Sequence, residues 1–299
     1  MRAKEVGVLL VLAALWGGGF LFIRIATPVL GPVALMAMRA LLAGLCLLLF
    51  AQVTQTRLAL RAYWRHYLVI GIINAALPFT LIGVAELSLT SGLAALLNAS
   101  TPLFGAITAV LWMKETMTLK KVLGLALGFL GVAILVGWSP LPFSVGFILA
   151  VMASLAAAAS YGIASVYIKI SLGNKVSSLA IATCSQFAAC LFLIPLTLVA
   201  PPMRVPSPSV LLAVAALALL CTAVTLLLYI WLIAHAGPTK TLTVTFLAPV
   251  FGVVWGVLFL SEPLTLSPFI GLILILVGAG LVTELLFGGR LRLERKTIL

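Results

Sequence analysis

Long apolar runs, separated by short polar or basic segments, follow one another along the whole chain. A transmembrane helix needs roughly 20 consecutive, mostly apolar residues, and runs of that length recur from one end of the sequence to the other. The pattern predicts ten spans, over residues 6–26, 32–53, 66–86, 91–113, 119–138, 144–169, 176–199, 208–234, 240–260 and 266–287. Because these spans take up most of the sequence, only short loops remain outside them.

Helices rather than barrel strands are expected in these runs. Residues 211–220 are apolar at both parities, whereas the strands of a membrane barrel alternate polar and apolar residues over about ten positions. The first run follows Arg2 and Lys4, as in a signal peptide, but Trp16 and three glycines interrupt it and no good small-residue cleavage site follows. We therefore predict an all-α integral membrane fold in which the first run is retained as a span.

Composition and charge support the same interpretation. The 299 residues are 64% hydrophobic and 8% charged, whereas soluble domains are about half apolar and about a quarter charged. With a cytoplasmic N-terminus, nearly all of the 18 Lys and Arg residues fall on the cytoplasmic side, and the exceptions are Arg24, Arg39 and Arg204. This positive-inside distribution predicts a bacterial inner-membrane protein with both termini in the cytoplasm. The net charge of +12 then faces anionic lipid headgroups, and no nucleic-acid partner is expected.

Landmark residues of the first half recur in the second half at a fixed offset. Pro102, Glu115, Gly124 and Gly131 are followed, 147 positions later, by Pro249, Glu262, Gly271 and Gly278. Near the start of each half, an offset of 145 pairs Trp16-Gly17 with Tyr161-Gly162 and Arg24 with Lys169. The chain therefore divides into two repeats, residues 1–140 and 141–299, with five predicted spans each. Because five is odd, the second repeat enters the membrane from the opposite side, as in many secondary transporters that work by alternating access.

Together these features resemble the drug/metabolite transporter superfamily, specifically the EamA-type exporters of ten helices. The resemblance rests on Trp16-Gly17 in the first span, on Pro32 with Arg39 seven residues later, and on two Glu-x8-Gly-x6-Gly blocks that begin at Glu115 and Glu262, and it covers essentially the whole chain. It implies two inverted five-helix repeats around a central cavity, and export of amino acids, related metabolites or hydrophobic toxic compounds. Among its branches the amino-acid exporters are the most similar, including those that handle aromatic residues and methionine.

Prolines inside the spans point to the walls of such a cavity. A proline cannot donate to the carbonyl four residues earlier, so it frees that carbonyl and bends the helix. Pro78, Pro102 and Pro249 free the carbonyls of Asn74, Asn98 and Thr245, in that order. Freed backbone at membrane depth is buried in protein or lines a cavity. We therefore predict helix breaks used in gating at the three prolines, and a substrate-binding role for the three polar residues, with simple helix–helix hydrogen bonding as the alternative.

Arg39 is the most informative single residue. It lies seven residues into its span, hence about 10 Å deep, where a charge requires a partner or water. Its guanidinium suits a substrate carboxylate, and the alternative is a pair with Glu86, which is also a candidate binding residue. Gln186 matches Arg39 at the 147 offset and is a further polar candidate. An aromatic lining for an amphipathic solute is predicted from Trp16, Tyr161 and Tyr229, with plain packing as the alternative.

Other conspicuous residues receive structural interpretations. Glu115 and Glu262 lie at helix junctions and are expected to cap the N-terminus of the following helix. The glycines of residues 124–131 and 271–278 are expected to form close helix-packing or dimer surfaces. The cysteines fall inside predicted spans and are interpreted as small core residues: Cys46, Cys184, Cys190 and Cys221.

The sequence favours a carrier without catalytic residues, metal or cofactor. It contains no aspartate and no G-x-x-x-x-G-K-[ST] motif, which excludes intrinsic ATP hydrolysis, and no G-x-S-x-G motif of a hydrolase. None of the six glutamates lies mid-span, so facilitation down the substrate gradient is preferred to ion coupling, with Glu86 and His235 as the remaining proton-binding candidates. A multidrug or lipophilic-cation exporter and a pore-type channel stay as alternatives. The oligomeric state is predicted to be a monomer or a homodimer.

Overall fold

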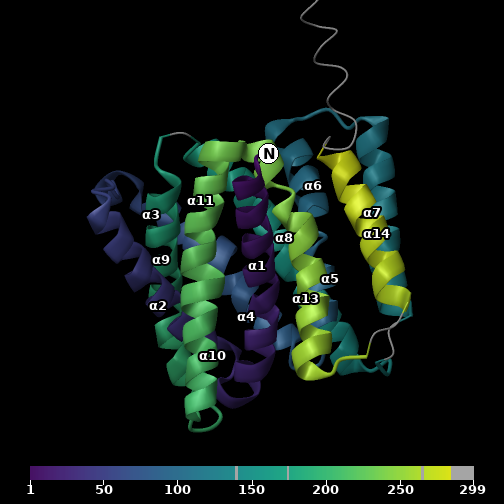
Figure 1. Ribbon diagram of the computed structural model, residues 1–299, viewed down its shortest axis with the longest axis horizontal. Helices are drawn as coiled ribbons and strands as arrows, with labels where there is room; N and C mark the ends of the chain where they lie inside the picture. Colours follow the sequence, from purple (N-terminus) through teal and green to yellow (C-terminus); the bar gives the residue numbers. More distant parts are fainter. Residues whose placement is uncertain (139–140, 174, 264–265, 284–299) are drawn as a thin grey trace, which may run out of the picture.

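The computed structural model describes residues 1–138, 141–173, 175–263 and 266–283, and every regular element within these ranges is helical (Figure 1). The α-helices are α1 (Ala3–Leu30), α2 (Pro32–Val53), α3 (Leu60–Gly71), α4 (Leu77–Ala85), α5 (Ser91–Asn98), α6 (Thr101–Met113), α7 (Leu119–Gly137), α8 (Val145–Ser171), α9 (Ser178–Val199), α10 (Pro208–Ala218), α11 (Thr225–Ala236), α12 (Pro238–Thr241), α13 (Val244–Leu260) and α14 (Leu266–Val282). Two π-helical segments complete the set: η1 (Ile72–Ala76) joins α3 to α4, and η2 (Leu219–Val224) joins α10 to α11.

The helices match the predicted hydrophobic runs. Eight helical segments of the described chain are long and apolar enough to cross a membrane, and two shorter apolar helices, Val244–Leu260 and Phe269–Val282, accompany them. The predicted all-α membrane fold is therefore confirmed. The end of the tenth predicted span, residues 284–287, lies outside the described residues. So do Glu294 and four basic residues used to predict the orientation: Arg290, Arg292, Arg295 and Lys296.

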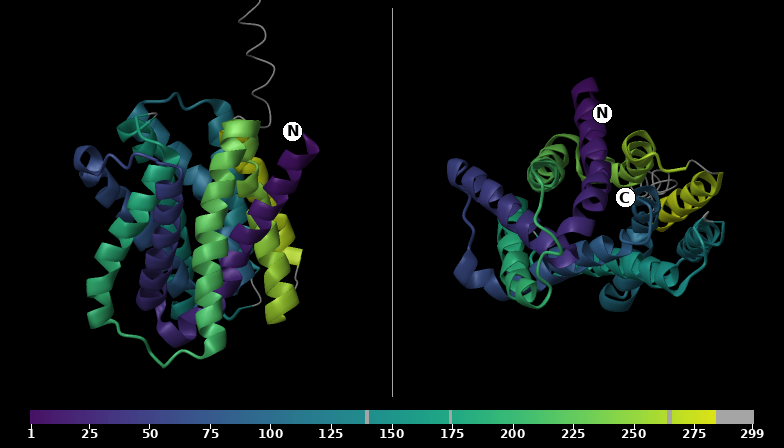
Figure 2. Two further views of the ribbon diagram at one scale, coloured as in Figure 1. Left: turned by 60° about the vertical axis from the view of Figure 1, so that its left-hand side comes forward. Right: turned by 90° about the horizontal axis from the view of Figure 1, so that it is seen from below.

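The helices stand side by side in a bundle (Figures 1 and 2). The N-terminus lies at the upper end in Figure 1, where α14 also ends, and we call this end the N-terminal face. At the lower end, which we call the opposite face, the loop between α9 and α10 turns back into the bundle. Large apolar side chains cover the outside of the bundle, and Leu111 is 71% and Leu198 85% exposed. Such a surface suits lipid rather than water.

Glycines allow two long helices to touch their neighbours along the backbone. A Cβ at Gly17 of α1 would lie 2.6 Å from the backbone nitrogen of Gly252 in α13. A Cβ at Gly162 of α8 would lie 2.6 Å from the backbone nitrogen of Gly105 in α6. These two contacts occupy matching repeat positions, because Trp16-Gly17 and Tyr161-Gly162 are the pair found at the 145 offset. The glycine that follows each aromatic residue thus fixes the distance between neighbouring helices.

The glycine faces of α7 and α14 pack against each other within the chain. A Cβ at Gly124 would lie 2.7 Å from the carbonyl oxygen of Gly278, and a Cβ at Gly131 would lie 2.7 Å from that of Gly271. Figures 1 and 2 show this pair of helices side by side at one edge of the bundle. Of the two interpretations of these glycines, the structure therefore supports intramolecular packing, which leaves the other helices to surround the centre.

Candidate functional site

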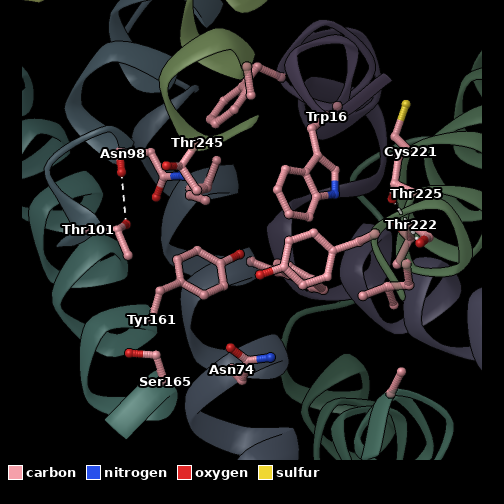
Figure 3. Close-up of a pocket in the computed structure, with 18 of the residues that line it drawn as sticks. Trp16, Asn74, Asn98, Thr101, Tyr161, Ser165, Cys221, Thr222, Thr225 and Thr245 are labelled. Carbon is pink, nitrogen blue, oxygen red and sulfur yellow. Dashed lines mark hydrogen bonds between the residues drawn. The ribbon is translucent and has the colours of Figure 1, made fainter. Parts of the chain in front are cut away.

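A cavity of about 510 Å³ lies between the helices (Figure 3). Its walls come from α1, α2, the η1–α4 segment, α5, α6, α8, α9, the η2–α11 segment and α13. Its polar lining consists of Arg39, Asn74, Asn98, Thr101, Tyr161, Ser165, Ser178, Ser185, Gln186, Thr222, Thr225, Tyr229 and Thr245. The α7–α14 pair contributes no lining residue.

Most of the residues singled out in the sequence meet at this cavity. The lining includes eight of the nine predicted binding residues, namely Trp16, Arg39, Asn74, Asn98, Tyr161, Gln186, Tyr229 and Thr245, together with Pro102 and Pro249. Pro78 is buried in α4 but is not among the lining residues. Glu86 ends α4 one turn beyond Ile82, which does line the cavity, and is not itself part of the lining.

Lining residues from the two halves match at the repeat offsets. The matched pairs are Arg39 with Gln186, Asn74 with Cys221, Phe79 with Leu226 and Asn98 with Thr245 at 147 positions, and Trp16 with Tyr161 and Ile23 with Ile168 at 145 positions. The same positions of both halves therefore build the wall. Their side chains differ, so the cavity is chemically asymmetric, with a single arginine in its lining.

The two π-helical segments also match at the 147 offset, and each carries lining residues. A π-helical turn is wider than an α-helical one and occurs mostly as short insertions at functional sites. In the first half, η1 holds Asn74 and is followed by Pro78, whose missing N–H disfavours a regular α-helix here. The carbonyl of Ile73 in η1 accepts a hydrogen bond from Ser160 Oγ of α8, at 2.6 Å. The irregular backbone is thus tied to a neighbouring helix.

The second π-helical segment forms without a proline. Thr222 Oγ1 donates to the carbonyl of Leu217, at 2.8 Å, and so satisfies a backbone group that the widened turn leaves free. Thr225 Oγ1 donates to the carbonyl of Thr222, at 2.9 Å. Hydroxyl groups therefore stabilise this turn and present Cys221 and Thr222 to the cavity.

Arg39 is buried on the cavity wall without a counter-ion. Its side chain is 8% exposed, and Nε donates to Thr222 Oγ1 at 2.9 Å. The guanidinium carbon lies 3.7 Å from the centroid of the Phe79 ring, a cation–π contact. Nη1 has only the Met36 sulfur, a weak acceptor, at 4.0 Å. Within the described part of the chain Arg39 forms no ion pair, with Glu86 or with any other carboxylate.

Two amides on the wall keep unused hydrogen-bonding capacity. Asn98 Oδ1 and Gln186 Oε1 are buried and have no hydrogen-bond partner among the described residues. The Asn98 carbonyl, which Pro102 frees, accepts from Thr101 Oγ1 at 2.8 Å (Figure 3). The chain therefore satisfies the freed backbone group and leaves the Asn98 side chain available to a solute. A buried polar atom without a partner is costly, so a ligand that donates to these oxygens would be stabilised.

Aromatic rings form the apolar part of the lining. Trp16 and Tyr161 point into the cavity from opposite walls (Figure 3). The Trp16 ring packs against Tyr229, with centroids 5.5 Å apart, and the Tyr161 ring packs against Phe79, with centroids 6.2 Å apart. Two aromatic pairs, an arginine and two amides in the lining of one cavity suit a solute that has an apolar body and a charged or polar end.

The cavity extends towards the N-terminal face. Its lining includes Ser178, the first residue of α9, and Thr245, the second residue of α13, and both helices begin at that face. Towards the opposite face the lining ends at Ile82 and Ala95. Beyond them, the backbone N–H groups of Ser91 and the next residue donate to the Glu262 carboxylate, at 2.6 and 3.0 Å. This contact holds α13 to the start of α5 and closes the opposite face.

The two repeat-related glutamates differ in their contacts. Glu262 accepts from the first N–H groups of α5, a helix of the first half of the chain. Residues 264–265, which lead into the helix that Glu262 was predicted to cap, lie outside the described residues. Glu115, at the N-terminal face, pairs with Lys121 at 2.9 Å and with Lys169 of α8 at 3.8 Å. The Lys121 hydrogen bond holds the pKa of the Glu115 carboxyl below its usual range, and the charge of Lys169 adds to this effect. The predicted capping of α7 by Glu115 is replaced by Thr118, whose hydroxyl accepts from the Lys121 N–H at 3.3 Å.

Many lining residues escaped the sequence interpretation, and three of them bear directly on the chemistry of the cavity. Cys221 was assigned to the core with the other cysteines, and all four cysteines are free thiols. Phe79 and Thr222, two lining side chains that contact the Arg39 guanidinium, were not selected at all. Applying the 147 offset to Asn74 would have identified Cys221, because the two are repeat mates. No sequence signal marks Phe79, since its role follows from the position of Arg39 on a neighbouring helix.

The family model and two related proteins that match nearly the full length of this chain are described as transporters. A family model described as the EamA-like transporter family matches residues 4–137 and again residues 148–284. The uncharacterized transporter YvbV of Bacillus subtilis is 28% identical over 291 residues, which cover 94% of this chain and 92% of YvbV. The uncharacterized inner membrane transporter YedA of Escherichia coli is 28% identical over 294 residues, which cover 95% of this chain and 93% of YedA.

The fold also has a counterpart among solved structures. One crystal structure superimposes with a TM-score of 0.68, covering 95% of this chain and 98% of the other, at 19% sequence identity. At this identity the match concerns the fold alone. The helical arrangement described above is therefore shared over nearly the full length of both chains.

Proposed function

The chain belongs to the EamA-like transporter family of the drug/metabolite transporter superfamily, and we propose that this membrane transporter exports amino acids and related amphipathic carboxylates through its central cavity. The aromatic lining favours solutes with an aromatic or other hydrophobic side chain. Export proceeds by alternating access, in which the cavity opens to one face at a time.

The observation that carries the proposal is the unpaired Arg39 on the cavity wall. A buried cation without a counter-ion is costly, and an anionic ligand removes that cost. The free nitrogens of a guanidinium bind a carboxylate through two parallel hydrogen bonds. The apolar rings of Trp16 and Tyr161 lie on the walls of the same cavity. A carboxylate at Arg39 with a side chain between these rings uses both kinds of surface.

An inverted-repeat architecture supports alternating access. We propose that residues 1–140 and 141–299 form two five-helix halves of opposite orientation, with ten membrane crossings and both termini in the cytoplasm. The two ranges matched by the family model agree with this division. The matching π-helical segments and the matched lining pairs support it further. Equivalent helices then open the cavity to one face in one state and to the other face in the second.

Ligand binding to the purified protein tests the substrate class. Thermal-shift measurements with L-phenylalanine, phenylethylamine and phenylpropionate separate the contributions of carboxylate, amine and ring. We expect stabilisation by the two carboxylates, and a loss of roughly 10- to 100-fold in their affinity in Arg39→Ala, as for a charge-assisted hydrogen bond. Arg204→Ala, which changes an exposed loop arginine, should leave both affinities unchanged.

The same screen distinguishes the competing functions. Asn98→Ala should weaken ligands that carry the amino group more than phenylpropionate, because Asn98 Oδ1 is a free acceptor. Stabilisation by tetraphenylphosphonium and not by carboxylates would indicate a lipophilic-cation exporter. A carboxylate response that is unchanged in Arg39→Ala would remove the proposed role of that residue.

A further inference from the structure

Glu86 is a buried carboxyl group with no hydrogen-bond partner. It ends α4 near the opposite face and is 1% exposed. Both carboxylate oxygens are enclosed and unpartnered among the described residues. Arg24 of α1 lies beside it, but the guanidinium Nη1 donates to the backbone carbonyl of Glu86 rather than to the carboxylate. A negative charge in this position would be buried without any hydrogen bond.

Two nearby sources of negative charge disfavour an ionised Glu86, whereas the charges of Arg24 and Arg39 favour one. The residue sits at the C-terminus of α4, where the partial negative charge of the helix dipole repels a carboxylate. Glu262 is nearby, and its carboxylate accepts hydrogen bonds from two backbone N–H groups at the N-terminus of α5. Its charge opposes a second negative charge in the same region.

The charged surroundings of Glu86 can be stated element by element. The interacting charged groups are Arg24 on α1, Arg39 on α2 and Glu262 after α13. The remaining packed helix, α8, has a single charged residue, Lys169, at its other end, near the N-terminal face. Among the described residues neither arginine forms an ion pair with the Glu86 carboxylate, since Arg24 donates to the backbone carbonyl of Glu86 and Arg39 donates to Thr222. In this state, with the opposite face closed, an ionised Glu86 would therefore be buried without a hydrogen bond or an ion pair among the described residues.

Within the described ranges, a buried and unpartnered carboxyl group of this kind occurs only near the opposite face. The repeat mate of Glu86 at the 147 offset is Ile233, an apolar residue near the N-terminal face. Two described carboxylates lie at that face: Glu115 is partly exposed and paired with Lys121 and Lys169, and Glu5 accepts from the exposed Arg2 N–H. Closure of the opposite face thus buries an acid that closure of the N-terminal face does not.

We propose that Glu86 is the proton-binding site of the transporter, protonated when the opposite face closes and ionised when it opens. In the open state water reaches the carboxylate, and the Arg24 guanidinium is free to pair with it. On closure the carboxylate takes a proton from a hydronium ion at the opposite face and becomes a carboxylic acid, with release of water. Glu86 then carries one proton per closure, and the exporter exchanges substrate for protons.

The cavity provides the exit for the proton. Ile82 lies one helical turn before Glu86, hence on the same side of α4, and it lines the cavity that extends to the N-terminal face. With the proposed orientation, a proton enters from the outside and leaves towards the cytoplasm. The exchange cycle thus rests on the proposed function, whereas protonation of Glu86 itself does not require a known substrate.

Infrared spectroscopy of the purified protein tests protonation directly. At neutral pH we expect a carboxylic acid C=O band that shifts in D₂O, is absent in Glu86→Gln and persists in the control Glu115→Gln. Glutamine has the shape of the protonated acid, so Glu86→Gln should fold. The band can also be titrated in the wild-type protein alone. If no such band occurs at neutral pH, or if it survives in Glu86→Gln, the inference is wrong.

Access to the opposite face tests the coupling to closure. In a background without the four native cysteines, a reporter cysteine at Ala95 is labelled by an impermeant maleimide added from the opposite face. One proton per closure gives a change in labelling rate of up to roughly tenfold per pH unit, rising as pH rises. Glu86→Gln should label slowly at every pH, and Glu115→Gln should follow the wild type.

The outcomes separate this inference from the proposed function. The role of Glu86 would be overturned if the labelling rate did not depend on pH, or if it depended on pH equally in Glu86→Gln. A labelling rate that depended on sodium instead of protons would also overturn it. Ligand stabilisation by carboxylates would remain in that case, and the transporter would be a facilitator. Conversely, a protonated Glu86 with no carboxylate response would leave the proton site in place and refute the proposed substrate.

Discussion

In the proposed binding mode, the aromatic side chains of the cavity bind the apolar part of the solute, and Arg39 binds its carboxylate. Trp16 and Tyr161 lie on facing walls and each packs on a second ring, which fixes their orientation (Figure 3). A solute ring held between them gains stacking energy in addition to burial, about 0.5–1.5 kcal/mol per aromatic pair.

Trp16→Ala and Tyr161→Ala should therefore weaken phenylalanine binding by roughly 2- to 10-fold, with a smaller effect on alanine. Isothermal titration or thermal shift with the two amino acids measures this difference. Trp112→Ala, at a tryptophan that is 52% exposed on the outside of the bundle, is the matched control. Equal losses for phenylalanine and alanine would show that the rings are packing residues only.

A pH effect is expected at the N-terminal face. Because the Lys121 hydrogen bond lowers the pKa of the Glu115 carboxyl, the pair stabilises the folded protein above the usual carboxyl pKa of about 4.3. This contribution is lost as pH falls through the lowered pKa of the folded state. Glu115→Gln should thus be slightly less thermostable than the wild type at neutral pH and equal to it in acid. A difference that grows on acidification would contradict the assignment.

Individual site residues could be predicted where a proline four residues later frees their backbone carbonyl. Asn74, Asn98 and Thr245 follow from the prolines four residues later, and all three line the cavity. The state of Glu86 did not follow, because the sequence places it at the end of an apolar run, where solvent is expected. Its burial results from the neighbouring helices, and in particular from α1, which carries Arg24 over the end of α4.

Close helix contacts at single glycines link the elements of the two halves. Any side chain at Gly17 or Gly162 meets backbone atoms of the neighbouring helix at 2.6 Å, and backbone cannot rotate away. The contact therefore fixes how closely α1 approaches α13, and how closely α8 approaches α6.

Gly17→Ala and Gly162→Ala should each destabilise the protein by about 1–3 kcal/mol, as overpacking does in other cores. Thermal unfolding in detergent measures the effect. At Gly7 no atom lies within 4 Å of an added Cβ, so Gly7→Ala should be neutral or slightly stabilising. Similar unfolding temperatures for all three variants would mean that these helices do not need to touch.

The positions of the helices were predictable and their interruptions only partly so. Hydrophobic runs located the spans because lipid imposes length and composition. The break between α5 and α6 lies just before Pro102, as expected. The break in the matching span lies instead between α12 and α13, and Pro249 remains inside α13. The π-helical segment η2 has no proline and is stabilised by hydroxyl groups, so the proline rule does not mark it.

The molecule as a whole combines symmetric helices with an asymmetric set of polar groups. Matched positions of the two halves line the cavity, yet the side chains at those positions differ. At the 147 offset Arg39 corresponds to a glutamine, and Glu86 corresponds to an isoleucine. In the proposed alternating-access cycle, equivalent helices of the two halves form two states of similar energy. The unmatched arginine and glutamate would then give those states different affinities for substrate and proton, as the proposed export requires.

Counterflow in proteoliposomes tests the central claim that the cavity is the binding site of a carrier. Liposomes preloaded with unlabelled L-phenylalanine should accumulate labelled L-phenylalanine transiently and saturably, and Arg39→Ala should abolish the accumulation while Arg204→Ala preserves it. Flux that rises linearly with concentration, is not accelerated by internal phenylalanine and appears as single-channel current steps would contradict the account and indicate a pore.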